Sequence, residues 1–189
     1  MSSHHIVREK QEPALLILSL ENFGDEDLGQ LLEWSPTLIA TLPVAEQLVV
    51  YGIKVDLIVA NPVSYFDQSD VKWIPVDGQS NLQAGLDYLL TQGYPAVNII
   101  TDRLETDIFS AYINQINLVI FYQGKKIYAI ASGFSKWRPA GQVVEVLSSN
   151  QEIAVQNLKL TAPQQYQTIA DGVTAFTFQS PRIFISEEY

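Results

Sequence analysis

Apolar residues follow two different patterns along the chain, and the change between them falls near residue 132. Before it, short continuous apolar runs alternate with stretches whose apolar residues recur every three or four positions. Runs of the first kind have the length of buried strands, and the second kind is typical of amphipathic helices. Strands are therefore predicted at 14–20, 37–41, 55–60 and 96–101, and helices at 25–34, 43–51, 81–92 and 107–116.

Residues that begin and end helices agree with this interpretation. Pro43 suits the first turn of a helix, and Gly52 supplies the left-handed cap that ends it. Ser80 can cap the next helix, whose apolar face would consist of Leu82, Leu86, Leu89 and Leu90. The alternation of strands and helices predicts an α/β domain with an open, mainly parallel sheet and helices on both faces.

The later part of the chain has the alternating pattern of half-buried strands. A hairpin is predicted over 117–131 with Gln123-Gly124 at its turn. Beyond Gly133 the segments 142–147, 153–160, 173–179 and 182–186 alternate apolar and polar residues and show no helical period. We therefore expect two domains, an α/β domain over 1–132 and a small antiparallel β-sandwich domain over 133–189.

Composition excludes several classes of protein. The chain of 189 residues has a net charge of −10 with its basic residues scattered singly, which argues against nucleic acid and anionic lipid as partners. It has no cysteine, and its only histidines are His4 and His5, so thiolate chemistry and an imidazole base in the body of the chain are excluded. No apolar run approaches the ~20 residues of a membrane span, and residues 1–12 lack an apolar signal core, so we expect a cytoplasmic protein.

In open α/β sheets, ligands bind beyond the carboxyl ends of the strands. The predicted strand at 55–60 is followed by Asn61, Pro62, Val63 and Ser64, none of which is charged. Turn and cap hydrogen bonding explains Asn61, Ser64 and Asn81 without a ligand.

The loop that follows 96–101 is the acidic one. Asp102, Glu105 and Asp107 surround Arg103 there, and Asp102 and Asp107 are the metal candidates that it offers. A solvated helix start with a local ion pair is the interpretation that we prefer for this loop.

Two segments resemble the thiamin pyrophosphokinase family, and the order of elements extends the resemblance over most of the chain. The stretch YGIKVDLIV at 51–59 is similar to the lead-in to the family motif G-D-F-D-S. Residues 81–98 are similar to the helix, glycine and strand that follow the motif D-K-T-D. The resemblance implies transfer of pyrophosphate from ATP to thiamin with Mg²⁺, a β domain that supplies the thiamin pocket, and a homodimer.

The motifs that carry the family's chemistry are largely replaced. An Asp-Gly pair of the family corresponds to Leu42-Pro43, and G-D-F-D-S corresponds to 60–64, where only Ser64 is kept. D-K-T-D corresponds to 78–81, and in the Asp-His loop only the aspartate remains. The family-equivalent positions are thus Asn61, Val63, Ser64, Asn81 and Asp107, and most of the carboxylates that would hold Mg²⁺ are absent.

We therefore expect a protein of this family type that has lost catalysis and acts as a binding or structural paralogue. No cofactor is expected for the chain itself, although Mg²⁺ and ATP serve the family reaction. The expected partners are a second copy in a homodimer and a small molecule related to thiamin. The alternatives are residual or altered activity with an ion at Asp102, Asp107 and Asn61, or a pure assembly module that pairs with itself or with an active relative.

Overall fold

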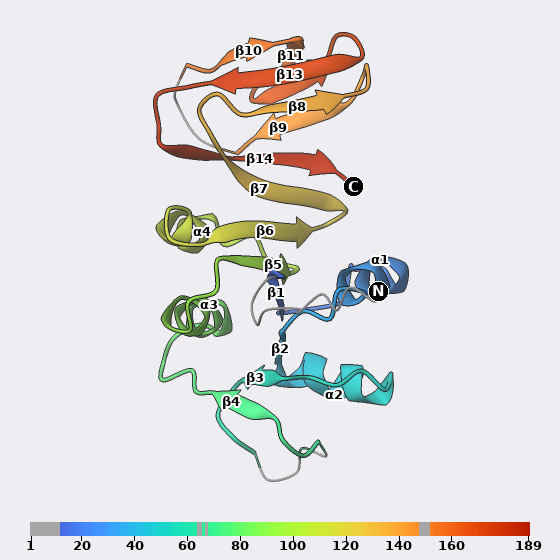
Figure 1. Ribbon diagram of the computed structural model, residues 1–189, viewed down its shortest axis with the longest axis vertical. Coiled ribbons are helices and arrows are strands. Elements are labelled where there is room, and N and C mark those ends of the chain that lie inside the picture. Colours follow the sequence, from blue (N-terminus) through green and yellow to red (C-terminus); the bar gives the residue numbers. More distant parts are fainter. Residues whose placement is uncertain (1–11, 64–65, 67, 148–151) are drawn as a thin grey trace, which may run out of the picture.

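The computed structural model describes residues 12–63, 66, 68–147 and 152–189, and Figure 1 shows the order of its elements. Ser64 and the two histidines of the first residues lie outside this range. The first elements are β1 (Ala14–Ile17), α1 (Asp25–Leu32), β2 (Leu38–Thr41), α2 (Leu42–Val50), β3 (Leu57–Val59), β4 (Lys72–Ile74), α3 (Asn81–Thr91), β5 (Ala96–Ile100) and α4 (Thr106–Tyr112). The later strands are β6 (Asn117–Tyr122), β7 (Lys125–Ala131), β8 (Ser135–Arg138), β9 (Val143–Val146), β10 (Ala154–Gln156), β11 (Leu158–Ala162), β12 (Gln165–Thr168), β13 (Gly172–Thr177) and β14 (Arg182–Glu188).

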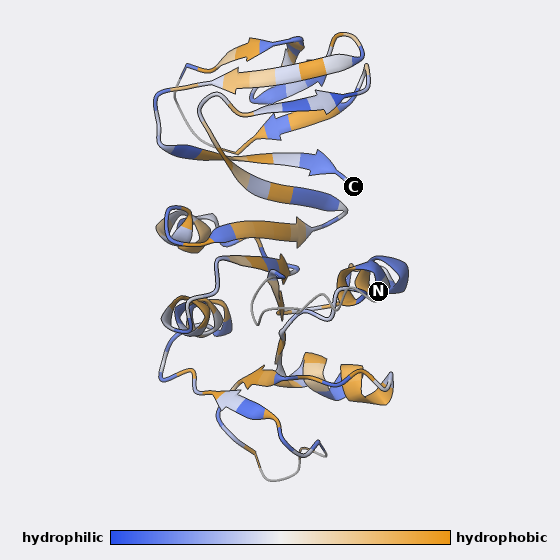
Figure 2. Cartoon of the chain, in the orientation of Figure 1, coloured by the Kyte–Doolittle hydropathy of each residue, from blue (hydrophilic) through white to orange (hydrophobic). Residues whose placement is uncertain are grey.

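Six neighbouring strands, in the order β6-β5-β1-β2-β3-β4, are parallel and form the α/β part of the molecule. Successive residues of a strand point to opposite faces, so the apolar run at 14–17 serves two cores. Leu15 and Ile17 pack in the cluster that contains α1 and α2, while Ala14 and Leu16 pack in the cluster that contains α3 and α4. Helices thus cover both faces of this half of the sheet, as Figures 1 and 2 show. Among the described residues, no helix is long and apolar enough to cross a membrane.

The same sheet continues with antiparallel strands, and this makes it larger than the sequence indicated. The hairpin turn at Gln123 and Gly124, with φ of 49° and 72°, reverses the chain between β6 and β7, as predicted. Beyond β7 the order is β14, β9, β12 and β11, all antiparallel, so the sheet has 11 strands and is mixed. A separate antiparallel sheet consists of β10, β13 and β8. An α/β part is therefore followed by antiparallel β structure, in agreement with the expected class.

Strands β8 and β12 were not predicted, and β8 lies where the sequence suggested a domain boundary. β8 has an unusual pattern because its basic residues Lys136 and Arg138 contact residues of β14, whereas Trp137 between them is 60% exposed. A strand with cations on its inner side does not show the usual apolar face. The division at 132/133 itself stays a prediction. Strand β7 lies before this division and β14 lies after it, yet the two strands are paired over their whole length.

A buried ion pair joins the two sheets. Arg138 on β8 is fully buried, and its guanidinium donates to Glu187 on β14 at 3.1 and 3.3 Å. Tyr128 and Thr174 accept further hydrogen bonds from the same guanidinium, and Lys136 donates to the other oxygen of Glu187. Burial alone would raise the pKa of Glu187, but the Lys136 and Arg138 cations hold it below its ordinary value of 4.5.

Burial and the Glu187 carboxylate raise the pKa of the Tyr128 hydroxyl, which donates to Glu187 at 3.1 Å. Every polar atom at the centre of this junction therefore has a partner, and the apolar residues of both sheets pack around it. That core includes Phe176 from the smaller sheet and Ile185 and Val146 from the larger one.

Replacing Arg138 with methionine should destabilise the protein strongly. The change leaves the buried Glu187 with Lys136 as its only cation, and breaking one side of a buried pair costs about 3 kcal/mol at the lower end of the usual range. For a chain of this size we expect the melting temperature to fall by about 6–12 °C in a thermal scan.

The double variant R138M/E187L is the informative comparison, because it removes both charges and should recover most of the lost stability. A double variant as unstable as R138M would show that the charge left unpaired is not the cause.

Candidate functional site

A cleft of about 820 Å³ lies beyond the carboxyl ends of the parallel strands β1, β2 and β5. Its position follows from the topology. The chain builds the sheet outward from β1 through β2 to β4, then returns to place β5 on the other side of β1. Helices that follow β1 and β5 therefore leave toward opposite faces, and a crevice opens where the two strands end.

Asp102 ties the two sides of this cleft together. It follows β5 directly, and its carboxylate accepts hydrogen bonds from the Ser19 hydroxyl and, at 2.8 Å, from the Asn22 amide. Ser19 in turn accepts the backbone N–H of Glu21 at 3.3 Å. Desolvation of the carboxyl acts to raise its pKa, but the hydrogen bonds from Ser19, Asn22 and the backbone lower it below the ordinary 3.8. Asp102 is therefore an anion that holds the loop after β1 in place.

Two threonines at strand ends complete the floor of the cleft. The Thr41 hydroxyl donates to the carbonyl of Leu18 at 3.3 Å, and Thr41 is 5% exposed. The Thr101 hydroxyl accepts the N–H of Arg103 and donates to its carbonyl, both at 3.1 Å. Thr41 is thus bonded to the loop after the neighbouring strand β1, and Thr101 to the loop after its own strand β5, and these bonds hold the floor in shape.

The amino end of α3 forms another part of the wall. Ser80 caps this helix as predicted, since its hydroxyl accepts the N–H of Gln83 at 3.2 Å and the Gln83 side chain faces back to the Ser80 N–H. Asn81, the next residue, also lines the cleft. A Cβ at Gly85 would lie 3.0 Å from Leu16, so the glycine sets how closely α3 approaches β1.

The structure brings together only some of the residues that the sequence suggested. Asn81 and Asp102 line the cleft, whereas Asn61 and Val63 follow β3 and do not belong to its lining. Asp107 is exposed in the first turn of α4, where it borders two smaller hollows of about 290 and 430 Å³. The cleft lies beyond the carboxyl ends of the parallel strands and is centred on β1 and β5, whereas Asn61 and Val63 follow β3.

Several residues of the cleft were not singled out as site residues from the sequence. Ser19 and Thr41 line it and Asn22 lies beside it, and their hydrogen bonds hold the cleft together. The available signal was their position, since each lies at or just after the carboxyl end of a predicted strand. Gln47 on α2 had no such signal, and its place in the lining depends on how the helix packs.

The charges of the cleft favour a cationic ligand. Glu21, Asp102 and Glu105 line it, and Arg103 is the basic residue among the described lining residues, which leaves an excess of two negative charges. Among the described residues, no three His, Cys, Asp or Glu side chains come close enough together to form a metal-binding group. The lining thus offers carboxylates and neutral hydrogen-bonding groups, a combination that suits a small polar cation.

Comparison with known proteins identifies the class of fold. No family model and no curated protein matches the sequence. Among solved structures, thiamine pyrophosphokinase from Bacillus subtilis is similar with a TM-score of 0.70 and 12% identity, over 94% of this chain and 99% of that one. The enzyme from Geobacillus thermodenitrificans gives 0.71 and 12%, over 93% of this chain and 97% of that one. The enzyme from Candida albicans gives 0.67 and 12%, over 94% and 88%.

The chain therefore has a thiamin pyrophosphokinase-like fold. The resemblance seen in the sequence is confirmed at the level of the fold, because the superposition includes both the parallel and the antiparallel parts of the molecule. Identities of 12% say nothing about which reaction, if any, the cleft performs.

Replacing Asp102 with asparagine should change how stability depends on pH. The lowered pKa means that the Asp102 carboxylate contributes stability that is fully present above its ordinary pKa of 3.8 and lost as the pH falls through the folded value. The melting temperatures of wild type and D102N should therefore differ most near neutrality and converge between about pH 5 and pH 2.

The matched control is D107N, because no hydrogen bond or ion pair to the Asp107 carboxylate is found among the described residues. We expect its melting curve to follow that of the wild type across the same pH range. Parallel pH curves for wild type and D102N would contradict the role of Asp102.

Proposed function

We propose that the chain is a thiamin pyrophosphokinase-like protein that binds a thiamin-related cation and has lost pyrophosphate transfer. One observation carries the proposal: a cleft of about 820 Å³ stands at the switch point of the sheet, with an excess of negative charge and without a metal-binding cluster among its described residues. Its volume is within the usual range of small-molecule sites. With this function we place the protein in the cytoplasm.

Thiamin suits the cleft by its chemistry. Its thiazolium ring carries a permanent positive charge, and its aminopyrimidine ring both donates and accepts hydrogen bonds. Glu105 and Glu21 supply negative charge, while Gln47 and Asn81 supply neutral polar groups. Asp102 adds to the negative potential even though its oxygens already accept hydrogen bonds from Ser19 and Asn22.

ATP suits the same cleft poorly. A triphosphate needs Mg²⁺ to neutralise it, and Mg²⁺ needs carboxylates arranged around it. The family-equivalent positions carry Asn61, Val63 and Asn81 instead, and the cleft's own acids do not gather into a metal-binding group within the described chain. Repulsion from the excess negative charge would then oppose binding of the bare nucleotide.

We also propose that two copies pair through the smaller sheet, which we expect to pack on the larger one as a β-sandwich. The outer side of the smaller sheet lacks charge, although the chain has a net charge of −10. Trp137 and Val173 are cross-strand partners on that side, 60% and 51% exposed, while Arg138 and Thr174 beside them are buried. The outward residues are Ser135, Trp137, Ala154, Gln156, Val173, Ala175 and Thr177.

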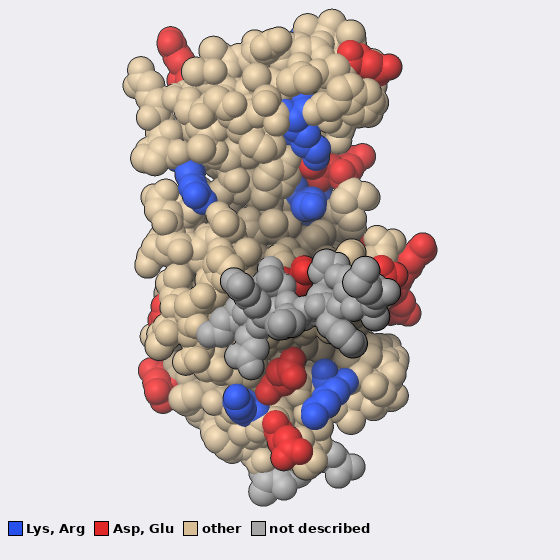
Figure 3. Space-filling view, in the orientation of Figure 1, with Lys and Arg blue, Asp and Glu red and all other residues tan. Residues whose placement is uncertain are grey.

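The absence of charge on the outer side of the smaller sheet favours a second copy of the chain as its partner. Two chains of net charge −10 repel each other at long range, so they can approach most easily through a surface without acids. On the face drawn in Figure 3, most of the surface of the β8–β14 region likewise carries neither acidic nor basic side chains. A two-fold contact of this surface would bury the Trp137 ring of each copy.

Calorimetric titration and thermal unfolding test the proposed ligand. Thiamin should bind, and at a hundred times its dissociation constant it should raise the melting temperature by about 5–11 °C, whereas millimolar Mg·ATP should give no shift. Removing one cleft carboxylate in E105Q should weaken thiamin binding about fivefold, while E33Q, at the end of α1 outside the cleft, should not.

The other outcomes separate the alternatives. Binding of both thiamin and Mg·ATP, abolished by a chelator, would favour retained enzymatic activity. Binding of neither would overturn the ligand proposal and favour the assembly module.

Light scattering tests the dimer. The wild type should have twice the chain mass of 21.1 kDa at micromolar concentration. W137E places like charges opposite each other across the two-fold contact and should weaken association at least about tenfold. L160E is the control, because Leu160 is also exposed but lies on β11 of the other sheet. A monomeric wild type, or equal loss of dimer in both variants, would contradict this contact.

A further inference from the structure

A second hollow lies on the same face of the sheet as α1 and shares no lining residue with the cleft. Its volume is about 330 Å³, and it is formed over β6, β7 and β14 with β8 at its side. Val119, Tyr128 and Phe134 form its apolar and aromatic walls, and Leu118 and Ala129, which pack in the core of the other face, also border it. We propose that this hollow binds a small aromatic anion, a flat ring that carries one carboxylate or phosphate group.

Charge at this hollow is opposite to that of the molecule as a whole. Lys126 and Lys136 line it, Arg138 lies behind it, and Glu187 is the acid among its described lining residues. Three cations and one carboxylate leave an excess of two positive charges in a chain whose net charge is −10. Glu188 follows Glu187 on β14, but the alternation of a strand directs it to the other face, opposite Lys125.

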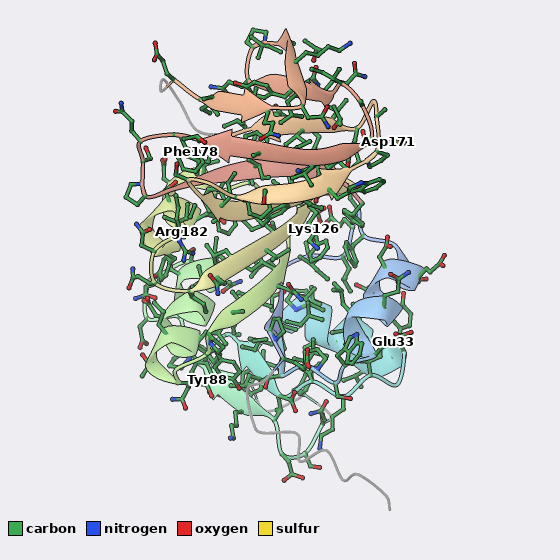
Figure 4. All side chains as sticks on the ribbon, turned by 45° about the horizontal axis from the view of Figure 1, so that its top comes forward. Glu33, Tyr88, Lys126, Asp171, Phe178 and Arg182 are labelled. Atoms are coloured by element: carbon green, nitrogen blue, oxygen red, sulfur yellow. The ribbon has the colours of Figure 1, made fainter. Side chains whose placement is uncertain are left out.

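Lys126 is the cation that is available to a ligand. Its ammonium forms no hydrogen bond or ion pair with any described residue, and it lies over the Phe121 ring, with 6.0 Å between the nitrogen and the ring centroid. Lys126 stands directly opposite Glu187 in the strand register, and Figure 4 shows it on β7 on the side where α1 lies.

Lys136 brings a second cation to the same acid, because it forms an ion pair with Glu187. An anion between the two ammonium groups would therefore meet positive charge from both β7 and β8.

The aromatic residues supply a platform for a ring. The Tyr128 and Phe134 rings lie 6.1 Å apart at 67°, and the Lys136 ammonium lies 5.8 Å from the Tyr128 centroid. The Tyr128 hydroxyl is held by Arg138 and Glu187, so its ring cannot turn away. A ligand ring placed against Tyr128 would direct a substituent toward the two lysines without disturbing the buried pair.

A purely structural role for the cluster leaves part of it unexplained. Joining the two sheets requires Arg138, Glu187, Tyr128 and Lys136, whose side chains bond to one another. It does not require Lys126, which contacts none of them through an ion pair and keeps its charge beside an apolar hollow. A binding site explains the presence of Lys126, whereas a purely structural role of the cluster does not.

Chemical-shift mapping with ¹⁵N-labelled protein tests the proposal, with phenyl phosphate, benzoate and benzyl alcohol as probes at up to about 10 mM. Phenyl phosphate or benzoate should shift the amide signals of Lys126, Tyr128, Phe134 and Lys136, and whichever binds more tightly identifies the anionic group. Benzyl alcohol, which has the ring but no charge, should bind at least about fivefold more weakly.

K126Q should weaken binding of the anionic probe about fivefold, whereas K125Q should not. Lys125 is the matched control because it neighbours Lys126 on β7 but faces the other side of the sheet, where it pairs with Glu145. Both variants change the net charge equally. Equal binding of benzyl alcohol, equal weakening in K125Q and K126Q, or the absence of shifts at the hollow would overturn the proposal.

Discussion

The buried ion pair between Arg138 and Glu187 is the interaction on which the arrangement of the two sheets depends. Two charges removed from water are stable together only when all their hydrogen bonds are made, and here Tyr128, Thr174 and Lys136 make the rest. The pair therefore permits one relative position of β8 and β14. The apolar core between the sheets, with Phe176 and Ile185, would tolerate small shifts more readily than this network does.

Most of the α/β part could be predicted from the sequence, because its strands and helices have clear local signals. Runs such as the one at 14–17 have strand length, and Ser80 and Gly52 mark helix ends at which the structure shows a cap and a positive φ. The β8 strand could not be predicted, since its inward side carries Lys136 and Arg138. Both bond to Glu187, about fifty residues later in the chain, and no local pattern reveals such a partner.

The cleft could be predicted only in part for a related reason. The edge of the sheet that carries ligands follows from parallel topology, but the strand pair at which it opens depends on the order of strands in space. Asp102 was a candidate, although as a metal ligand, and the structure shows it bonded to Ser19 and Asn22. Asp102 is eighty or more positions from both of these residues, so their contact depends on the fold and has no local sequence signal.

The place of β14 in the sheet has a consequence for how the protein forms during synthesis. Residues 182–188 are synthesised after every other described strand of the sheet, yet they lie inside it, between β7 and β9. The strands from β1 to β6 can assemble while translation continues, because all of their neighbours, β7 included, precede β14 in the chain. β9, β12 and β11 have no connection to that part of the sheet until β14 arrives. The nascent chain must therefore keep the exposed edge of β7 free of other strands until its own partner emerges.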